Sequence, residues 1–113
     1  MGQESGKGVG LVVRGVMEEH LYIVTYDIGD PKRWRVVYSL MNGYGEWLQL
    51  SVFQCRLSRK RHAEMIATLD EIISAVDDHV VIVDLGLAEI VKPKVVSLGK
   101  TGFTPVQRQA IIV

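Results

Sequence analysis

The order in which apolar patterns follow one another constrains the fold of this chain more than any other feature. Runs of β-branched and aromatic residues, typical of strands, alternate with segments whose apolar residues recur at three- and four-residue spacing, typical of amphipathic helices. The predicted strands cover 21–27, 47–57, 79–85 and 94–98, and the predicted helices cover 31–42 and 59–76. The order is therefore strand, helix, strand pair, helix, strand, and one further strand.

This order predicts an α+β, ferredoxin-like βαββαβ fold, in which two helices cover one face of a four-stranded antiparallel sheet. The segment 47–57 is long for one strand, so a bulge or a hairpin corner is expected near 51–54. The additional C-terminal strand, 94–98, has no obvious place in that sheet. We expect it to pair with the edge of a second copy, which makes a homodimer natural.

Local signals set the predicted helix ends. Asp30 is a good N-cap for the first helix and Pro31 fits its first position, while Gly43 begins the segment that ends it. Ser58 is the expected cap of the second helix. The apolar stripe predicted for that helix consists of Met65, Ile66, Leu69, Ile72, Ile73 and Val76.

The chain has 113 residues, which is one domain's worth. We expect a variable or flexible leader at 1–20, the ferredoxin-like domain at 21–99, and a C-terminal tail at 100–113 that is a candidate partner-docking segment. No apolar run approaches the roughly 20 residues that a membrane span needs, and the first twenty residues lack the pattern of a signal peptide. A single cysteine excludes an internal disulfide framework and fits a cytoplasmic protein.

The formal net charge is zero, but the charges are unevenly distributed along the sequence. Basic residues dominate 30–62, whereas 63–91 contains seven acidic residues and no Lys or Arg. Such asymmetry can place a basic patch on one face of a neutral protein, although solvated helices explain it equally well. The candidate phosphate ligands are Arg33, Arg35, Arg56, Arg59, Lys60 and Arg61.

Most catalytic motifs are absent from the sequence. Its Gly-Lys segments do not match a phosphate loop, its three histidines are too dispersed for a local zinc site, and no nucleophile elbow is present. What remains is Asp27, at the end of the first predicted strand, where a carboxylate can hold a hard cation such as Mg²⁺. One carboxylate is too few alone, but a two-fold axis would allow two copies of Asp27 to share an ion at the dimer seam. The alternative is that Asp27 only caps a turn.

Several of these features follow one another in the order and spacing of a known family. They are a hydrophobic strand ending in Tyr26-Asp27, a helix opening with Arg33 and Arg35, a Tyr44-Gly45 stop, and a strand with Gln49, Ser51, Val52 and Phe53. With them, residues 21–99 resemble the CRISPR-associated protein 2 family, the small subunit of the spacer-acquisition complex. The chain departs from many members at Trp47, where they carry a basic residue.

The resemblance implies a ferredoxin-like homodimer whose last strand crosses to the partner. It also implies a complex in which the dimer bridges two dimers of the CRISPR-associated protein 1 integrase and lies against the prespacer, a double-stranded DNA. Whether that integrase carries an associated or fused exonuclease is left open. Family members also resemble endonucleases that use Mg²⁺ or Mn²⁺ to cut RNA or double-stranded DNA. By position, the metal ligand and catalytic residue would be Asp27, the basic pair Arg33 and Arg35, and the motif-associated residues Tyr26, Ser51 and Phe53.

Three functional hypotheses follow. The first is a structural DNA-binding subunit of the adaptation complex, for which Asp27 is dispensable, and it is the one favoured here. The second is a metal-dependent endonuclease, for which Asp27 is essential. The third is a module outside CRISPR systems, such as a toxin-type ribonuclease of related fold or a small-ligand sensor.

Overall fold

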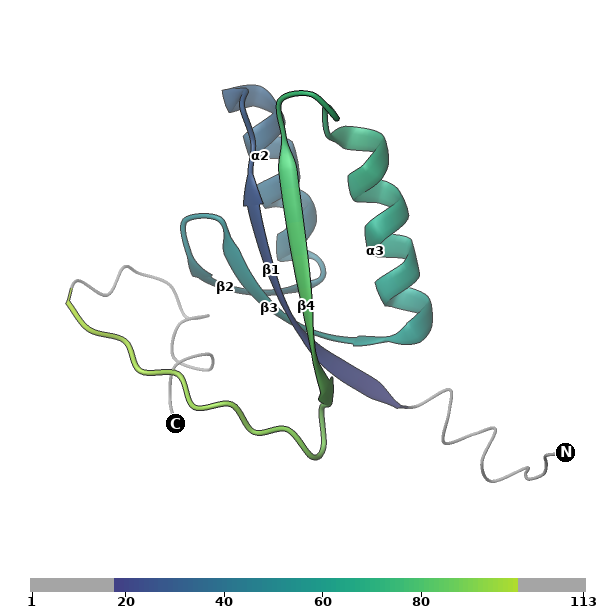
Figure 1. Cartoon of the computed structure of the whole chain (residues 1–113), viewed down its shortest axis with the longest axis vertical. Helices are drawn as coiled ribbons and strands as arrows, with labels where there is room; N and C mark the ends of the chain where they lie inside the picture. Colours follow the sequence, from purple (N-terminus) through teal and green to yellow (C-terminus); the bar gives the residue numbers. More distant parts are fainter. Residues whose placement is uncertain (1–17, 100–113) are drawn as a thin grey trace, which may run out of the picture.

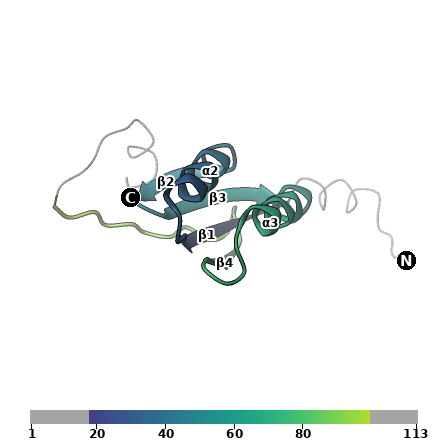
Figure 2. The ribbon, with the colours of Figure 1, turned by 90° about the horizontal axis from the view of Figure 1, so that it is seen from above.

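The computed structural model describes residues 18–99, which form one antiparallel sheet with two helices (Figure 1). The elements are β1 (Glu19–Asp27), α2 (Pro31–Asn42), β2 (Gly45–Gln49), β3 (Val52–Ser58), α3 (Arg59–Ile72) and β4 (His79–Leu87). The strand order is β2-β3-β1-β4, and both helices lie on one face of the sheet (Figure 2). The predicted α+β, ferredoxin-like arrangement is therefore confirmed. Most of the predicted leader, 1–17, and the whole tail, 100–113, lie outside the described residues.

The predicted helix caps are confirmed. The Asp30 carboxylate accepts a hydrogen bond from the Arg33 amide at 2.9 Å, and Pro31 occupies the first helical position of α2. The Ser58 hydroxyl accepts a hydrogen bond from the Arg61 amide at 3.2 Å and begins α3. Each helix thus begins where a side-chain acceptor satisfies an amide of its first turn.

The long strand-like segment forms a hairpin, one of the two expected alternatives. β2 and β3 are joined by a tight turn at Leu50 and Ser51, which overlaps the start of the predicted corner at 51–54. Leu50 has φ 31°, and its carbonyl accepts a hydrogen bond from the Trp47 indole at 3.0 Å. The register shifts between Trp47 and Gln49, which gives the hairpin the bulge that sequence length also suggested.

Alternate residues of the two central strands form the core beneath the helices. On β1 and β3 these residues pair directly, as Tyr22 does with Cys55 and Val24 with Phe53. The full set of buried residues in the cluster is Tyr22, Val24, Tyr26, Val37, Met41, Phe53, Cys55, Leu57, Met65 and Leu69. Within residues 18–99, no helix covers the other face of the sheet.

The prediction for the end of the second helix is wrong, because α3 stops at Ile72 rather than at residue 76. The amide of Ser74 donates to the Asp78 carboxylate at 2.8 Å, and the Ser74 hydroxyl accepts from the Asp77 amide at 3.3 Å. Such local side-chain bonds compete with the helical pattern. Val76, predicted to be in the core, is consequently 90% exposed, and Ile66 is also exposed.

The predicted strand at 94–98 is not formed in the single chain. After β4 the chain runs away from the sheet without regular structure through residue 98, and Val96 and Leu98 are exposed (Figure 1). A strand needs a neighbour to accept its backbone hydrogen bonds, and none of the described strands lies beside this segment in one chain. Within residues 18–99, no helix has the length and apolar character to span a bilayer.

Candidate nucleic-acid interface

Asp27 lies at the exposed end of β1, opposite His79 of β4. Side chains alternate between the two faces of a strand, so Asp27 shares its face with Thr25 and Ile23. The neighbouring residue, Tyr26, points to the opposite face and into the core. Asp27 is therefore presented on the face of the sheet that has no helices, which we call the open face.

The part of the open face formed by β1 and β4 is largely apolar. Ile23 pairs with Val83 and Thr25 pairs with Val81, and the two valines are 45% and 40% exposed. On the other side of β1, Thr25 pairs with Val52. The two uncovered valines of β4 lie beside Ile23 and Thr25 of β1 and make a contiguous exposed patch, which is typical of a face that binds another protein surface.

Tyr26 and Phe53 are buried on the helical face, with ring centroids 6.2 Å apart. Burial raises the pKa of Tyr26 to about 12, and the nearby Ser51 hydroxyl lowers this pKa in part. The Tyr26 hydroxyl has no hydrogen-bond partner of good geometry among the described residues. Its place in the core separates it from the surface that carries Asp27.

Ser51 connects the hairpin to both neighbouring elements. Its hydroxyl accepts a hydrogen bond from the Trp34 indole at 2.8 Å, and its carbonyl accepts one from the Tyr26 amide at 3.1 Å. The β2–β3 turn is thereby held against α2 and against the end of β1. This part of the family motif has a structural explanation within the single chain.

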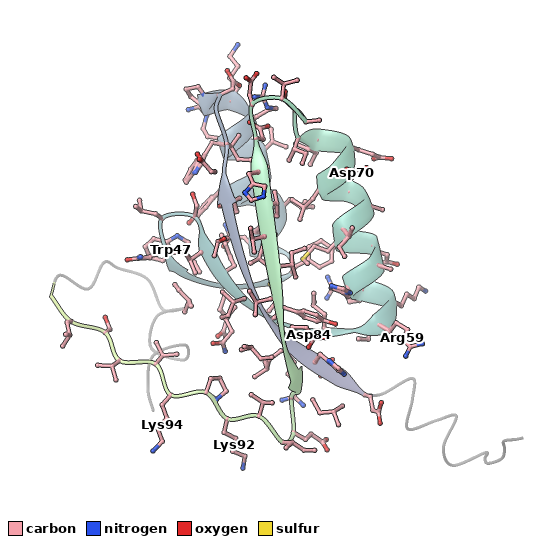
Figure 3. The ribbon with its side chains drawn as sticks, viewed as in Figure 1. Trp47, Arg59, Asp70, Asp84, Lys92 and Lys94 are labelled. Atoms are coloured by element: carbon pink, nitrogen blue, oxygen red, sulfur yellow. The ribbon has the colours of Figure 1, made fainter. Side chains whose placement is uncertain are left out.

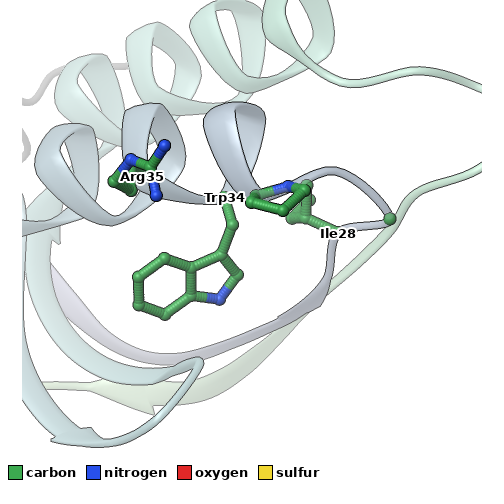
Figure 4. A pocket seen from close by; sticks show the side chains of 5 residues that line it. Ile28, Trp34 and Arg35 are labelled. Atoms are coloured by element: carbon green, nitrogen blue, oxygen red, sulfur yellow. The ribbon is translucent and has the colours of Figure 1, made fainter.

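A shallow groove of about 470 Å³ lies beside the end of β1 and the start of α2. Its lining consists of Ile28, Gly29, Pro31, Trp34 and Arg35. Figure 4 shows the Trp34 indole between Arg35 and Ile28. The indole also stacks on Tyr38, with ring centroids 5.2 Å apart. The groove thus combines an aromatic ring with an exposed guanidinium.

The two arginines of the first turns of α2 have different surroundings. Arg35 is exposed, whereas the Arg33 guanidinium forms an ion pair with Asp78 at 2.8 Å. The Asp78 side chain has no exposed surface. Arg33 lowers the pKa of Asp78 far below its usual range, and backbone donors from Ser74 and Gly29 add to this effect.

Three of the other predicted phosphate ligands, Arg59, Lys60 and Arg61, lie at the opposite end of the helical layer in the first turn of α3, whereas Arg56 of β3 faces away from the helices. Arg59 and Lys60 are exposed. The Arg61 guanidinium donates to the Gly43 carbonyl at 3.1 Å and lies 4.6 Å from the centroid of the Tyr44 ring. Arg56 is paired with Glu19 at 2.7 Å. The six candidates therefore form two groups at the two ends of the fold.

Two further basic residues join the second group. Lys92 and Lys94 are exposed on the segment that follows β4, toward the same end of the molecule as Arg59 (Figure 3). Asp70 lies toward the other end of α3. Sequence reasoning assigned no role to these lysines, although their spacing around Pro93 was a usable signal of an exposed basic segment.

Asp27 is the single metal-ligand candidate that the sequence offered, and one chain does not complete a site around it. Residues 18–99 contain no group of three or more His, Cys, Asp or Glu side chains arranged to hold a metal ion. Mg²⁺ is often held by one or two carboxylates, several waters and substrate phosphates. An exposed Asp27 fits that donor set only if a second copy or a bound nucleic acid supplies the remaining oxygens.

The chain is a small α+β protein of ferredoxin-like fold, with an exposed aspartate at the end of β1 and exposed cations at the helix ends as a candidate nucleic-acid surface. The family model described as CRISPR associated protein Cas2 matches residues 20–92. The chain belongs to this family. Family membership supports a CRISPR role and disfavours the interpretation as a toxin-type ribonuclease outside CRISPR systems.

Curated relatives cover nearly the whole length of the fold. The chain is 60% identical over 95 residues to the CRISPR-associated endoribonuclease Cas2 of Geobacter sulfurreducens, covering 84% of this chain and 99% of that protein. It is 54% identical over 95 residues to the CRISPR-associated endoribonuclease Cas2 1 of Rhodospirillum rubrum, covering 84% and 92% of the two chains. These names associate the family with nuclease activity in general.

Solved structures are similar in fold. A hypothetical protein from Thermus thermophilus superposes with a TM-score of 0.63 at 29% identity, covering 75% of this chain and 96% of that one. Cas2 of Streptococcus pyogenes superposes with a TM-score of 0.55 at 32% identity, covering 58% and 86% of the two chains.

Proposed function

We propose that this chain is a structural DNA-binding subunit of a CRISPR adaptation complex, which holds the prespacer duplex as a homodimer. The observation that carries the proposal is the exposure of cations at both ends of the helical layer, with Arg35 at one end and Arg59 and Lys60 at the other. Phosphate contacts of this kind fix a duplex in position without reading its sequence. A protein that must accept any spacer needs that property.

The position of Arg59 and Lys60 supports a role beyond solvation. Both stand in the first turn of α3, where a cation opposes the partial positive charge of the helix N-terminus. No acidic residue occupies that turn to offset them. In a homodimer each cation occurs twice, so a small number of exposed residues can follow the closely spaced phosphates of a duplex.

A homodimer through the open face explains the exposed valines of β4. Covering Val81 and Val83 with the same face of a second copy would remove their apolar surface from water, by an interface that matches itself about a two-fold axis. The exposed segment 94–98 would then find a strand edge in the partner. Asp27 lies on this face, so the same interface brings its two copies toward the seam.

Val83→Asp tests this interface. We expect the dissociation constant of the dimer to rise at least about 10-fold, because the interface would enclose two unpaired carboxylates. Val36→Asp is the matched control, since Val36 is 50% exposed but lies on α2. Sedimentation equilibrium of the full chain measures both variants. A monomeric wild-type protein, or equal effects of the two substitutions, would contradict the proposed dimer.

Duplex binding tests the electrostatic part of the proposal. Lys60→Gln should reduce the slope of log affinity against log salt by about two, because two phosphate contacts are lost per dimer. Arg56→Gln should change the slope by less than half as much, since Glu19 already pairs with this guanidinium. The measurement is fluorescence anisotropy with two duplexes of unrelated sequence, whose affinities should agree within about 3-fold. A sequence-dependent affinity, or a slope insensitive to Lys60, would argue against a phosphate scaffold.

The partners that this role requires are the CRISPR-associated protein 1 integrase and the prespacer. We expect the chain to co-elute with its cognate integrase and a prespacer duplex from a sizing column at low salt. The candidate docking segment is the tail 100–113, so a chain shortened after residue 99 should lose the integrase while keeping its duplex affinity. Failure of the full chain to associate with the integrase would count against the adaptation role.

A second function, metal-dependent endonuclease activity, is favoured by the position of Asp27 on the open face. Two copies of Asp27 would hold one Mg²⁺ or Mn²⁺ at the dimer seam together with the scissile phosphate. The bound ion would act as a Lewis acid on the phosphoryl oxygens. The chain's own contribution is to fix the carboxylates at the ends of the two β1 strands and to bind the flanking phosphates through Arg35.

Asp27→Asn separates the two functions. Under the nuclease proposal, Mg²⁺-dependent cleavage of single-stranded RNA or duplex DNA should fall at least about 100-fold, because metal catalysis contributes several kcal/mol. Under the scaffold proposal, spacer integration should persist. Asp70→Asn, at an exposed position of α3, is the control and should change neither activity. Cleavage that survives Asp27→Asn would exclude this residue as the catalytic carboxylate.

A further inference from the structure

The carboxylate of Asp78 is the most completely bonded charged group among the described residues. It accepts hydrogen bonds from Arg33 Nε at 2.8 Å, Arg33 Nη2 at 3.1 Å, the Gly29 amide at 2.8 Å and the Ser74 amide at 2.8 Å. These donors come from the β1–α2 turn, the first turn of α2 and the turn after α3. One side chain thus ties together residues 29–33 and residues 74–78, two segments that lie far apart in the sequence.

The cluster lies directly beside Asp27. Gly29 follows Asp27 by two residues, and Asp78 precedes His79, the residue paired with Asp27 across the sheet. The two turns approach so closely that a Cβ on Gly29 would lie 3.1 Å from the Asp77 carbonyl oxygen. Movement of either turn would therefore displace the end of β1.

We propose that the two arginines of the basic pair have separate roles: Arg33 positions the turn that follows Asp27 by binding Asp78, and Arg35 is the phosphate ligand. This inference deepens the proposed duplex-binding function and rests on it for the role of Arg35. Arg33 is a positioning residue because its guanidinium acts through Asp78.

The chemistry of the pair supports this division. A guanidinium bound to a carboxylate through two donors is held in a fixed orientation, and its charge is offset by its partner. The Asp78 side chain is shielded from solvent, so withdrawing Arg33 toward a phosphate would leave a shielded carboxylate without its counter-charge. Arg35 is exposed at the mouth of the groove beside Trp34, with its guanidinium open to solvent (Figure 4).

Lysine substitutions distinguish the two roles, because lysine keeps the charge and loses the two-donor geometry. For Arg33→Lys we expect amide hydrogen exchange at Gly29 to accelerate at least about 10-fold, and the amide resonances of Asp27 and Gly29 to shift. Asp78→Asn should produce the same changes. Arg35→Lys should leave exchange at Gly29 unchanged. Arg56→Lys, at the exposed ion pair with Glu19, is the matched control and should also leave it unchanged.

Duplex binding supplies the second measurement. Arg35→Gln should reduce the slope of log affinity against log salt concentration by about two. Arg33→Gln and Asp78→Asn should lower the affinity by the same factor as each other and should keep the slope of the wild type. In thermal unfolding, the double variant Arg33→Gln/Asp78→Asn should be more stable than the sum of the two single changes predicts, because both residues belong to one interaction.

Three results would overturn the proposal. The first is that Arg33→Gln reduces the slope of log affinity against log salt as much as Arg35→Gln does. The others are that Arg33→Lys leaves hydrogen exchange at Gly29 unchanged, or that the Arg33 and Asp78 substitutions have additive effects on stability. Failure of the proposed function is a different result, in which the wild-type protein binds no duplex at any salt concentration. In that case Gly29 exchange and the double-variant comparison still decide the role of Arg33.

Discussion

Side chains of the central strand β1 alternate between the two faces of the sheet, and this alternation determines what each face presents. Tyr22, Val24 and Tyr26 face the helices and form the core with β3, so the residues between them must face the other way. Ile23 therefore lies on the open face beside Val83 of β4, and this pair begins the apolar part of that face. The alternation also separates Tyr26 from Asp27, although the two are adjacent in the family motif.

Charge compensation determines the geometry at the end of the sheet that carries Asp27. The carboxylate of Asp78 is shielded, so it requires donors, and it obtains them from Gly29, Arg33 and Ser74. The bond to Ser74 accompanies the end of α3 at Ile72, and the bond to Gly29 draws the β1–α2 turn toward β4. The length of the helix and the position of the turn thus depend on the same side chain.

Features that depend on neighbouring residues could be predicted from the sequence, and features that depend on distant ones could not. Caps such as Asp30 and Ser58 act three residues away, so they were identified correctly. The end of α3 involves Asp78, whose guanidinium partner is 45 residues distant. The segment 94–98 pairs with neither outer strand of its own sheet, β2 or β4, so its pairing depends on contacts beyond one chain. The sequence shows which segments are basic. It does not show that folding places these residues at opposite ends of the molecule, or that Arg33 forms an ion pair with Asp78.

The open face links the two proposed functions more closely than the basic residues do. Phosphate contacts at the helix ends are useful to a scaffold only when they recur along a duplex, which requires two copies in fixed orientation. A shared metal ion requires the same two copies, because each contributes one carboxylate. Dimerisation is thus a condition for both functions, whereas Asp27 is needed for one and the exposed cations chiefly for the other. Under these proposals, loss of nuclease activity would leave the scaffold role intact, whereas loss of the dimer would remove both functions.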